Sequence, residues 1–342
     1  MSIKEVARIA GVSTATVSRY LNSPEHVREK TRKKVQEAIR STGYAPNTLA
    51  RNFRRGKTSL VVVVLPSVGD PFFEGVMRGI WRVADAEGYS ILIRETQFNT
   101  HEFDDYSEIV FSKQADGIIL LASTSPFTSG PAERAGHGDR LPPIVIGCET
   151  VAPQLSQFPS VRVDNAAAAA EATAHLVQLG HRRIGFIAGL QASLLTRDRE
   201  QGYRQAMAEA GLPVADEWIV EGRQTLDGAR AAARQLLALS PRPTAIFCAN
   251  DEMAMGAMHE IRRAGLRIPQ DISVIGFDDI RYAEILDPPL TTVAQPTEEI
   301  GEHTMRRLCR AIDGGDIGAE PEIVPHRLVV RESTAAPPAD ES

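Results

Sequence analysis

The start of the chain has apolar residues at three- and four-residue intervals, a spacing that predicts short amphipathic helices. The first helix would bury Ile3, Val6, Ala7 and Ala10. Gly11 is suited to end this helix, and Ser13 is suited to cap a second helix that follows at once. The second helix would bury Val17, Tyr20 and Leu21 and turn Thr14, Ala15 and Arg19 outward. Two short helices joined by a tight turn are the arrangement that places a recognition helix in the major groove of DNA.

A third helix is predicted from Glu29 to Thr42, and a short segment follows it after Pro46 and Asn47. This segment covers residues 48–55, and eight residues form only a marginal helix in water. Its apolar and basic residues are Leu49, Arg51, Phe53, Arg54 and Arg55. We expect the segment to become ordered only against DNA and a partner chain.

From Ser59 onward the pattern changes to β-branched and apolar runs separated by helical stretches. The runs have the length and composition of buried parallel strands. They cover residues 60–65, 89–93, 117–121, 143–146, 184–188, 245–248 and 272–277. This alternation predicts an α/β fold with parallel sheets, and a stretch of roughly 270 residues favours two similar lobes over one sheet.

The net charge of the whole chain is −6, but the charge is unevenly distributed. Residues 1–58 carry 13 Lys and Arg against 4 Asp and Glu, a net charge of +9, so the remainder carries −15. A basic arm on an acidic body is typical of a protein that binds DNA through one segment. A solvated charged face is the alternative explanation, and the predicted helix-turn-helix argues against it.

The sequence lacks the motifs of several other classes of protein. It has no G-x-S-x-G, H-E-x-x-H, paired C-x-x-C or P-loop motif, so we expect neither catalysis nor a cofactor. Cys148, Cys248 and Cys309 lie far apart, which predicts no disulfide and no metal site and is typical of a reducing cytoplasm. Without an apolar run of membrane-spanning length or a signal peptide, a cytoplasmic protein with no membrane partner is expected. His175 and His181 are interpreted as ordinary surface or capping residues.

Polar and aromatic residues follow several of the predicted strands, where parallel α/β sheets bind their ligands. These residues are Asp70, Phe72, Phe73, Arg197, Asp198, Arg199, Asn250, Asp251, Asp278 and Asp279. Aromatic rings can cover the apolar face of a sugar or base, and Arg and Asp form strong hydrogen bonds with hydroxyl groups. An Asp at a strand end is about as often a helix cap as a ligand contact, so the argument for a binding cleft depends on the residues jointly.

Several stretches together resemble the lactose/galactose-repressor (LacI/GalR) family of bacterial regulators over nearly the whole chain. They are I-K-E-V-A-R-I-A-G-V-S-T-A-T-V-S-R, Y-A-P-N-T-L-A-R-N, N-D-E-M-A-M-G-A, P-Q-D-I-S-V-I-G-F-D-D and P-P-L-T-T-V-A-Q-P. The resemblance implies an all-α helix-turn-helix headpiece and a hinge helix. It also implies an α/β core of the type I periplasmic-binding-protein kind, with two parallel-sheet lobes, that forms a homodimer on a palindromic operator.

The pattern and the resemblance together divide the chain into four parts. Residues 1–45 are expected to form the headpiece, 46–58 the hinge helix and linker, 59–334 the core, and 335–342 a disordered tail. Within the core, the first lobe would comprise about residues 59–161 and 291–320. The second lobe would comprise about residues 162–290 and 321–334.

The family motifs imply roles for individual residues in binding DNA. By position, Thr14, Ala15 and Arg19 would contact base edges in the major groove. Phe53 would enter the minor groove, where many members of the family have Leu, so the bend in the DNA can differ. The other residues of the hinge segment assigned to DNA are Leu49, Arg51 and Arg54.

The motifs also imply a binding site for a small molecule. Arg199, Asn250 and Asp278 match ligand contacts of the family, and Phe73, next to Phe72, matches an aromatic wall. Gln224 stands where the purine-binding member has a stacking aromatic residue, which disfavours a free purine base held between two rings. Cys148 stands where many members have Asp, which puts the contacts from that loop in doubt.

Further stretches, among them D-P-F-F, S-K-Q-A-D-G-I-I-L-L and G-F-D-D-I, resemble most the nucleoside-responsive members of the family. They predict a repressor of nucleoside uptake or catabolism that a nucleoside induces, with ribose or another sugar as the alternative effector. Whether a cyclic-AMP receptor protein is a co-regulator stays open. Two other classes also stay open: a sugar or nucleoside receptor without DNA binding, and an enzyme that acts on nucleosides.

Overall fold

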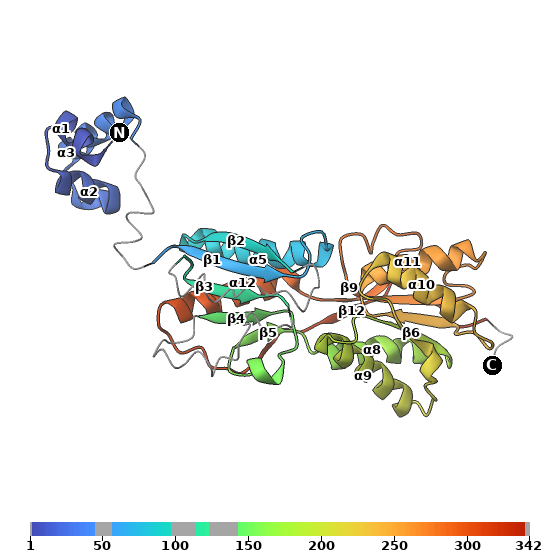
Figure 1. The fold of residues 1–342 in the computed structure, drawn as a ribbon. Coiled ribbons are helices and arrows are strands. Elements are labelled where there is room, and N and C mark those ends of the chain that lie inside the picture. Colours follow the sequence, from blue (N-terminus) through green and yellow to red (C-terminus); the bar gives the residue numbers. More distant parts are fainter. Residues whose placement is uncertain (1, 45–56, 97–113, 123–142, 339–342) are drawn as a thin grey trace. The chain divides into compact units, whose positions relative to one another are not determined.

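The structure is a computed structural model, and it describes residues 2–44, 57–96, 114–122 and 143–338 (Figure 1). The chain divides into two units, residues 1–58 and residues 59–342. Most of the predicted hinge segment lies outside the described residues, and with it Leu49, Arg51, Phe53 and Arg54. In the parts that are described, every helix is too short or too polar to span a lipid bilayer.

The first unit is the predicted bundle of short helices: α1 (Ile3–Ala10), α2 (Thr14–Asn22), a 3₁₀ turn (Pro24–His26) and α3 (Glu29–Thr42). The Oγ of Ser13 accepts a hydrogen bond from the backbone N–H of Thr16 at 3.1 Å and so caps α2. Gly11 ends α1 in the left-handed conformation at φ 65°, which glycine adopts without steric cost. The bundle encloses a small core of Val6, Ala7, Ala10, Val17, Val35 and Ala38. The predicted helix-turn-helix is confirmed.

The second unit contains two six-stranded sheets, which form two lobes (Figure 1). The first sheet is entirely parallel, in the order β11-β5-β4-β3-β1-β2. Its strands are β1 (Leu60–Leu65), β2 (Ser90–Glu95), β3 (Gly117–Leu120), β4 (Ile144–Gly147), β5 (Ser160–Arg162) and β11 (Glu322–Ile323). A short 3₁₀ turn (Pro153–Leu155) lies between β4 and β5.

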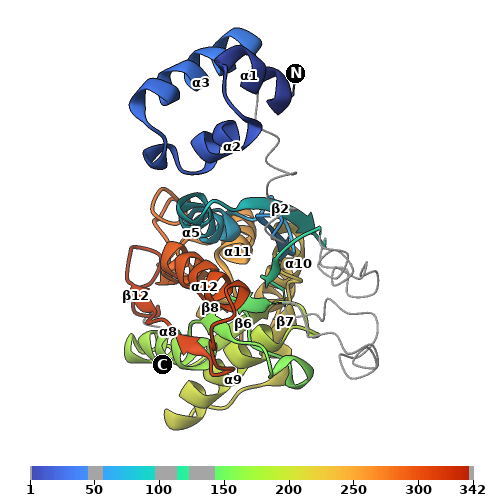
Figure 2. The same ribbon diagram turned by 90° about the vertical axis from the view of Figure 1, so that its left-hand side faces the viewer.

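Helices α5 (Pro71–Glu87) and α12 (Thr297–Ile312) lie side by side against the first sheet (Figure 2). Their backbones approach so closely that a Cβ atom on Gly79 would lie 2.0 Å from the carbonyl oxygen of Glu298. Alternate residues of β1 pack into different clusters: Val61 and Val63 belong to the main core, and Val62 and Val64 to a second cluster. The continuous apolar run in the sequence therefore reflects a strand that is buried on both faces.

The second sheet has the order β12-β10-β9-β8-β6-β7 and is parallel except for the edge strand β12. Its strands are β6 (Ile184–Ala188), β7 (Ile219–Glu221), β8 (Ala245–Cys248), β9 (Ser273–Asp278), β10 (Thr291–Ala294) and β12 (Arg327–Val329). Its helices are α8 (Asn165–Gln178), α9 (Leu194–Glu209), α10 (Leu226–Leu237) and α11 (Asp251–Arg263), with a 3₁₀ turn (Asp216–Trp218) before β7. Figure 1 shows α8 and α9 on one side of the sheet and α10 and α11 on the other. The predicted two-lobed α/β core is confirmed.

Two short strands lie in the lobe opposite to the one that the sequence indicated. The sequence predicts residues 291–294 in the first lobe, but β10 pairs with β9, with Thr292 opposite Gly276. It predicts residues 322–323 in the second lobe, but β11 pairs with β5, with Glu322 opposite Val161. The chain therefore passes between the lobes a few residues later than expected at both places, because pairing with a distant strand decides where each segment belongs.

Two further expectations are wrong around His181. Its side chain is 1% exposed, and its ring nitrogens lie within hydrogen-bond distance of the hydroxyls of Thr244 and Ser273. His181 is therefore a buried residue that contacts the starts of β8 and β9, and it is neither a surface nor a capping residue. The carbonyl oxygen of Ala335 lies 2.8 Å from Nε2 of His181, and its N–H donates to the Ser273 hydroxyl at 3.0 Å. These bonds hold Ala335, the first residue of the predicted disordered tail, against the second sheet, so the prediction is wrong at this residue.

Candidate functional site

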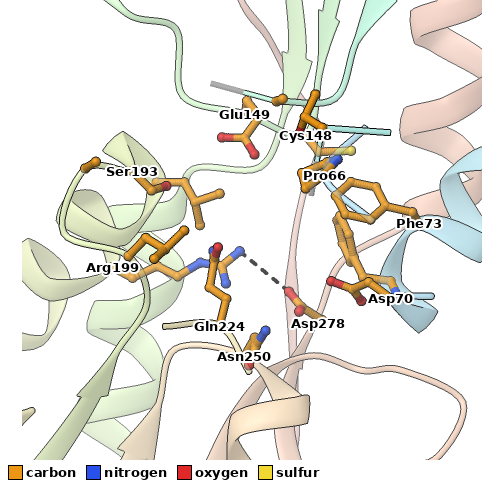
Figure 3. A pocket seen from close by; sticks show the side chains of 16 residues that line it. Pro66, Asp70, Phe73, Cys148, Glu149, Ser193, Arg199, Gln224, Asn250 and Asp278 are labelled. Carbon is orange, nitrogen blue, oxygen red and sulfur yellow. Dashed lines mark hydrogen bonds and ion pairs between the residues drawn. The ribbon is translucent and has the colours of Figure 1, made fainter. Parts of the chain in front are cut away.

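A cavity lies between the two lobes, at the carboxyl ends of their parallel strands (Figure 3). It encloses about 850 Å³, counting the part that is open to solvent, which is within the usual range for small-molecule sites. All six predicted ligand-binding residues line it: Phe72, Phe73, Arg199, Gln224, Asn250 and Asp278. The first two come from the first lobe and the other four from the second, so both lobes contribute to one candidate site.

Arg199, on α9, is held in place by several partners and is only 5% exposed. Its Nε donates to Oδ1 of Asn165 at 2.9 Å, and its Nη1 donates to the carbonyl oxygen of Ala249. Its Nη2 lies 3.5 Å from Oδ1 of Asp278. The guanidinium group also stacks over the ring of Phe277, 3.7 Å from the ring centroid, which is a cation–π contact. Arg199 is therefore preorganised, with little side-chain freedom left to lose when a ligand binds.

Asp278, the last residue of β9, is the acidic partner in this arrangement. Its backbone has a φ of 120°, and Nε2 of Gln295 donates to its Oδ1 at 2.8 Å. Burial raises the pKa of Asp278 to about 7, and the positive charge of Arg199 opposes that rise. The arginine and the carboxyl group form a polar pair that can bind the hydroxyl groups of a sugar.

Asn250 and Asp70 each have a structural role in addition to lining the cavity. Oδ1 of Asn250 accepts from the N–H of Met253 at 2.8 Å and caps α11. Asp70 caps α5 by accepting from the N–H of Phe72 at 2.9 Å.

Asp251, also singled out in the sequence, does not line the cavity, and it accepts from the hydroxyl of Thr292 and the N–H of Ile280. Asn250 and Asp70 are thus helix caps that also line the cavity, whereas Asp251 does neither.

An aromatic wall closes the first-lobe side of the cavity. The rings of Phe72 and Phe73 meet edge to face, with 5.1 Å between centroids and an interplanar angle of 77°. Phe73 is 6% exposed, so its ring belongs to the core of the first lobe as well as to the cavity. Figure 3 shows Phe73 across the cavity from Arg199.

The backbone is unusual at three of the residues that line the cavity. Cys148, Gln224 and Asp278 have φ values of 66°, 57° and 120°, in the region that non-glycine residues rarely adopt. Such conformations persist only where surrounding structure enforces them, and they concentrate at binding sites. They support the identification of this cavity as the functional site of the second unit.

Glu149 also lines the cavity, and the sequence interpretation missed it. It is 6% exposed, and its Oε2 has no hydrogen-bond partner among the described residues. Burial raises the pKa of Glu149 to about 8, and Arg199 opposes the rise. The sequence carries a signal for this residue, because Glu149 follows the carboxyl end of β4 just as Asp278 ends β9.

The predicted DNA-contacting residues of the headpiece lie together on α2. Thr14, Ala15 and Arg19 are all exposed, while Val17 on the same helix is fully buried. The buried face fixes the helix in the bundle and leaves the opposite face available for a groove of DNA.

Comparison with known proteins agrees with this architecture. Residues 2–47 match the model of bacterial regulatory proteins of the lacI family, and residues 173–334 match a periplasmic binding protein-like domain. The HTH-type transcriptional repressor CytR of Escherichia coli strain K12 is 40% identical over 98% of this chain and 97% of its own. The chain belongs to the LacI family. It is accordingly a DNA-binding transcriptional repressor and not an enzyme.

Two solved structures of the family extend the likeness to the fold. A Lac repressor dimer bound to operator and the anti-inducer ONPF matches 98% of this chain and 99% of its own, with 28% identity and a TM-score of 0.83. The regulator CelR in complex with cellobiose matches 97% of this chain and 99% of its own, with 31% identity and a TM-score of 0.73. Repressors of this family bind operator DNA and small-molecule effectors, and they form dimers.

Proposed function

We propose that this chain is a repressor of genes for nucleoside uptake or catabolism and that a nucleoside is its inducer. The observation that carries the proposal is the cavity between the lobes. It sets the Arg199–Asp278 pair, suited to the hydroxyl groups of a pentose, across from the aromatic wall of Phe72 and Phe73, suited to a base. The likeness to CytR over nearly the full length of both chains points the same way.

The two lobes give the ligand a means to control DNA binding. A molecule that contacts both Phe73 and Arg199 binds most tightly when the lobes have one particular separation. It therefore favours that state over others. The coupling free energy between two sites, here the effector site and the DNA-binding headpiece, is typically about 1–3 kcal/mol. In a dimer on a palindromic operator, the ligand-favoured state would misplace the two hinge segments, residues 46–58, and release Thr14, Ala15 and Arg19 from the bases. A cyclic-AMP receptor protein is the further partner proposed from the sequence.

A thermal-shift screen of the full-length protein tests the class of effector. We expect one or more nucleosides to raise the melting temperature, since a ligand at 100 times its Kd stabilises the native state by about 2.7 kcal/mol. D-ribose and free bases at the same concentrations are expected to give smaller shifts, because each fills only one end of the cavity. A shift with ribose but with no nucleoside would contradict the proposal and favour the pentose alternative.

A further inference from the structure

Glu149 provides the cavity with an acidic group that is separate from the Arg199–Asp278 pair. Figure 3 shows its carboxyl group directed into the cavity, on the side away from Asn250 and Asp278. It is 6% exposed, and its Oε2 finds no hydrogen-bond partner among the described residues. A buried polar atom without a partner destabilises the folded state, so a ligand that supplies the missing hydrogen bond removes that cost.

Among the described residues, no charged group forms a direct ion pair with Glu149. Arg199, from α9, attracts it, but its guanidinium group already donates to Asn165 and Ala249 and lies beside Asp278. Asp278, from β9, and Asp70, before α5, are acidic themselves and line the same cavity.

The neighbouring Cys148 adds no charge, because burial raises the pKa of its thiol well above its ordinary value and keeps it neutral. With its pKa raised to about 8, Glu149 is mostly protonated at neutral pH.

We propose that Glu149 binds the effector as a neutral carboxyl group that donates a hydrogen bond through one oxygen and accepts one through the other. Such a group pairs with an edge on which a donor and an acceptor lie side by side. Nucleobases have edges of this kind, and the inference rests on the proposed nucleoside effector. A carboxylate, by contrast, only accepts, and it would require two donors, such as neighbouring hydroxyl groups of a sugar.

The placement of Glu149 gives a nucleoside one orientation in the cavity. The base edge would meet Glu149, while the pentose hydroxyls would meet Arg199 and Asp278 on the other side. Glu149 thereby makes the site selective for a base joined to a sugar. A free pentose would leave the Glu149 carboxyl group unsatisfied.

Calorimetric titration of the full-length protein with cytidine tests the inference through Glu149→Gln and Glu149→Ala. Glutamine keeps one donor and one acceptor but does not titrate, so E149Q is expected to bind within about threefold of the wild type at pH 7. E149A, which lacks both groups, is expected to bind at least about tenfold more weakly. Cytidine does not titrate between pH 7 and pH 9, so changes over this range come from the protein.

The pH dependence separates a neutral carboxyl group from a carboxylate. Between pH 7 and pH 9 the wild type is expected to lose about tenfold more affinity than E149Q, because a group with a pKa of about 8 must take up a proton to bind. Asp278 titrates in both proteins, so the comparison isolates Glu149. Glu252→Gln is the matched control, since its pKa is also raised but it does not line the cavity, and it should behave as the wild type.

Two outcomes would overturn the inference, and they differ from failure of the proposed function. E149Q binding cytidine as weakly as E149A, or wild-type affinity that rises toward pH 9, would show that a carboxylate makes the contact. Ribose binding as tightly as cytidine would show that the base edge adds nothing. If no nucleoside bound to the wild type at either pH, the proposed effector would fail as well.

Discussion

Arg199→Ala is expected to lower the free energy of unfolding by about 3–5 kcal/mol and to abolish effector binding. Removing one member of a buried ion pair leaves the other charge without compensation, which accounts for a loss of this size. The side chain is 5% exposed, and its loss would leave Oδ1 of Asn165 and the carboxyl group of Asp278 without their hydrogen-bond donor or cation. Denaturant unfolding, followed together with an effector titration, measures both effects.

Two further variants control this experiment. Arg204→Ala removes an arginine from the same helix, where Arg204 pairs with Glu200 on the surface at 2.8 Å, and it should change stability little. Arg199→Lys keeps the positive charge but not the planar array of donors, so it should recover part of the stability while binding the effector poorly. If R199A were as stable as R204A and bound the effector normally, the role assigned to Arg199 would be wrong.

Arg19→Ala is expected to weaken operator binding strongly while leaving the fold and effector binding unchanged. A bidentate contact between Arg and guanine contributes about 1–3 kcal/mol. A dimer makes the contact in both half-sites, so the expected loss is roughly 2–6 kcal/mol for the whole operator. Arg19 is exposed on α2, and its removal therefore leaves no cavity in the bundle around Val17. Operator titration at fixed salt measures the change.

The control for Arg19 is a second exposed arginine of the headpiece. Arg8 lies on α1 and pairs with Glu5 at 2.6 Å, and R8A removes the same charge without touching the proposed recognition face. If R8A and R19A weakened operator binding equally, the contribution of Arg19 would be general attraction to phosphates and would carry no base recognition.

Much of the fold could be predicted from the sequence, because it is specified by residues close together in the chain. Ser13 and Gly11 mark the ends of helices through their own backbone and side-chain chemistry. The apolar runs 60–65, 184–188 and 245–248 form strands with the predicted bounds. A strand that is buried on both faces is a continuous apolar run, and such a run can be recognised from the local sequence alone. The six predicted ligand-binding residues line one cavity because parallel strands bring their carboxyl ends together.

The features that were missed depend on partners far away in the sequence. The ring nitrogens of buried His181 lie within hydrogen-bond distance of Thr244, just before β8, and of Ser273, on β9. The lobe to which β10 belongs depends on pairing with β9, which a four-residue pattern does not encode. Glu149 is a polar residue after a strand in the sequence, and only the packing of the lobes reveals its burial and its unpartnered oxygen.

The central claim is that a nucleoside bound near Phe73, Arg199 and Asp278 lowers the affinity of the protein for its operator DNA. The most direct test uses an operator selected from random sequences with the full-length protein. Its affinity is then measured by fluorescence anisotropy with and without saturating cytidine. We predict that cytidine lowers operator affinity by the roughly 5- to 150-fold that typical coupling energies allow, and that R199A abolishes the effect. Operator affinity that no nucleoside changes, or that cytidine raises, would contradict the account.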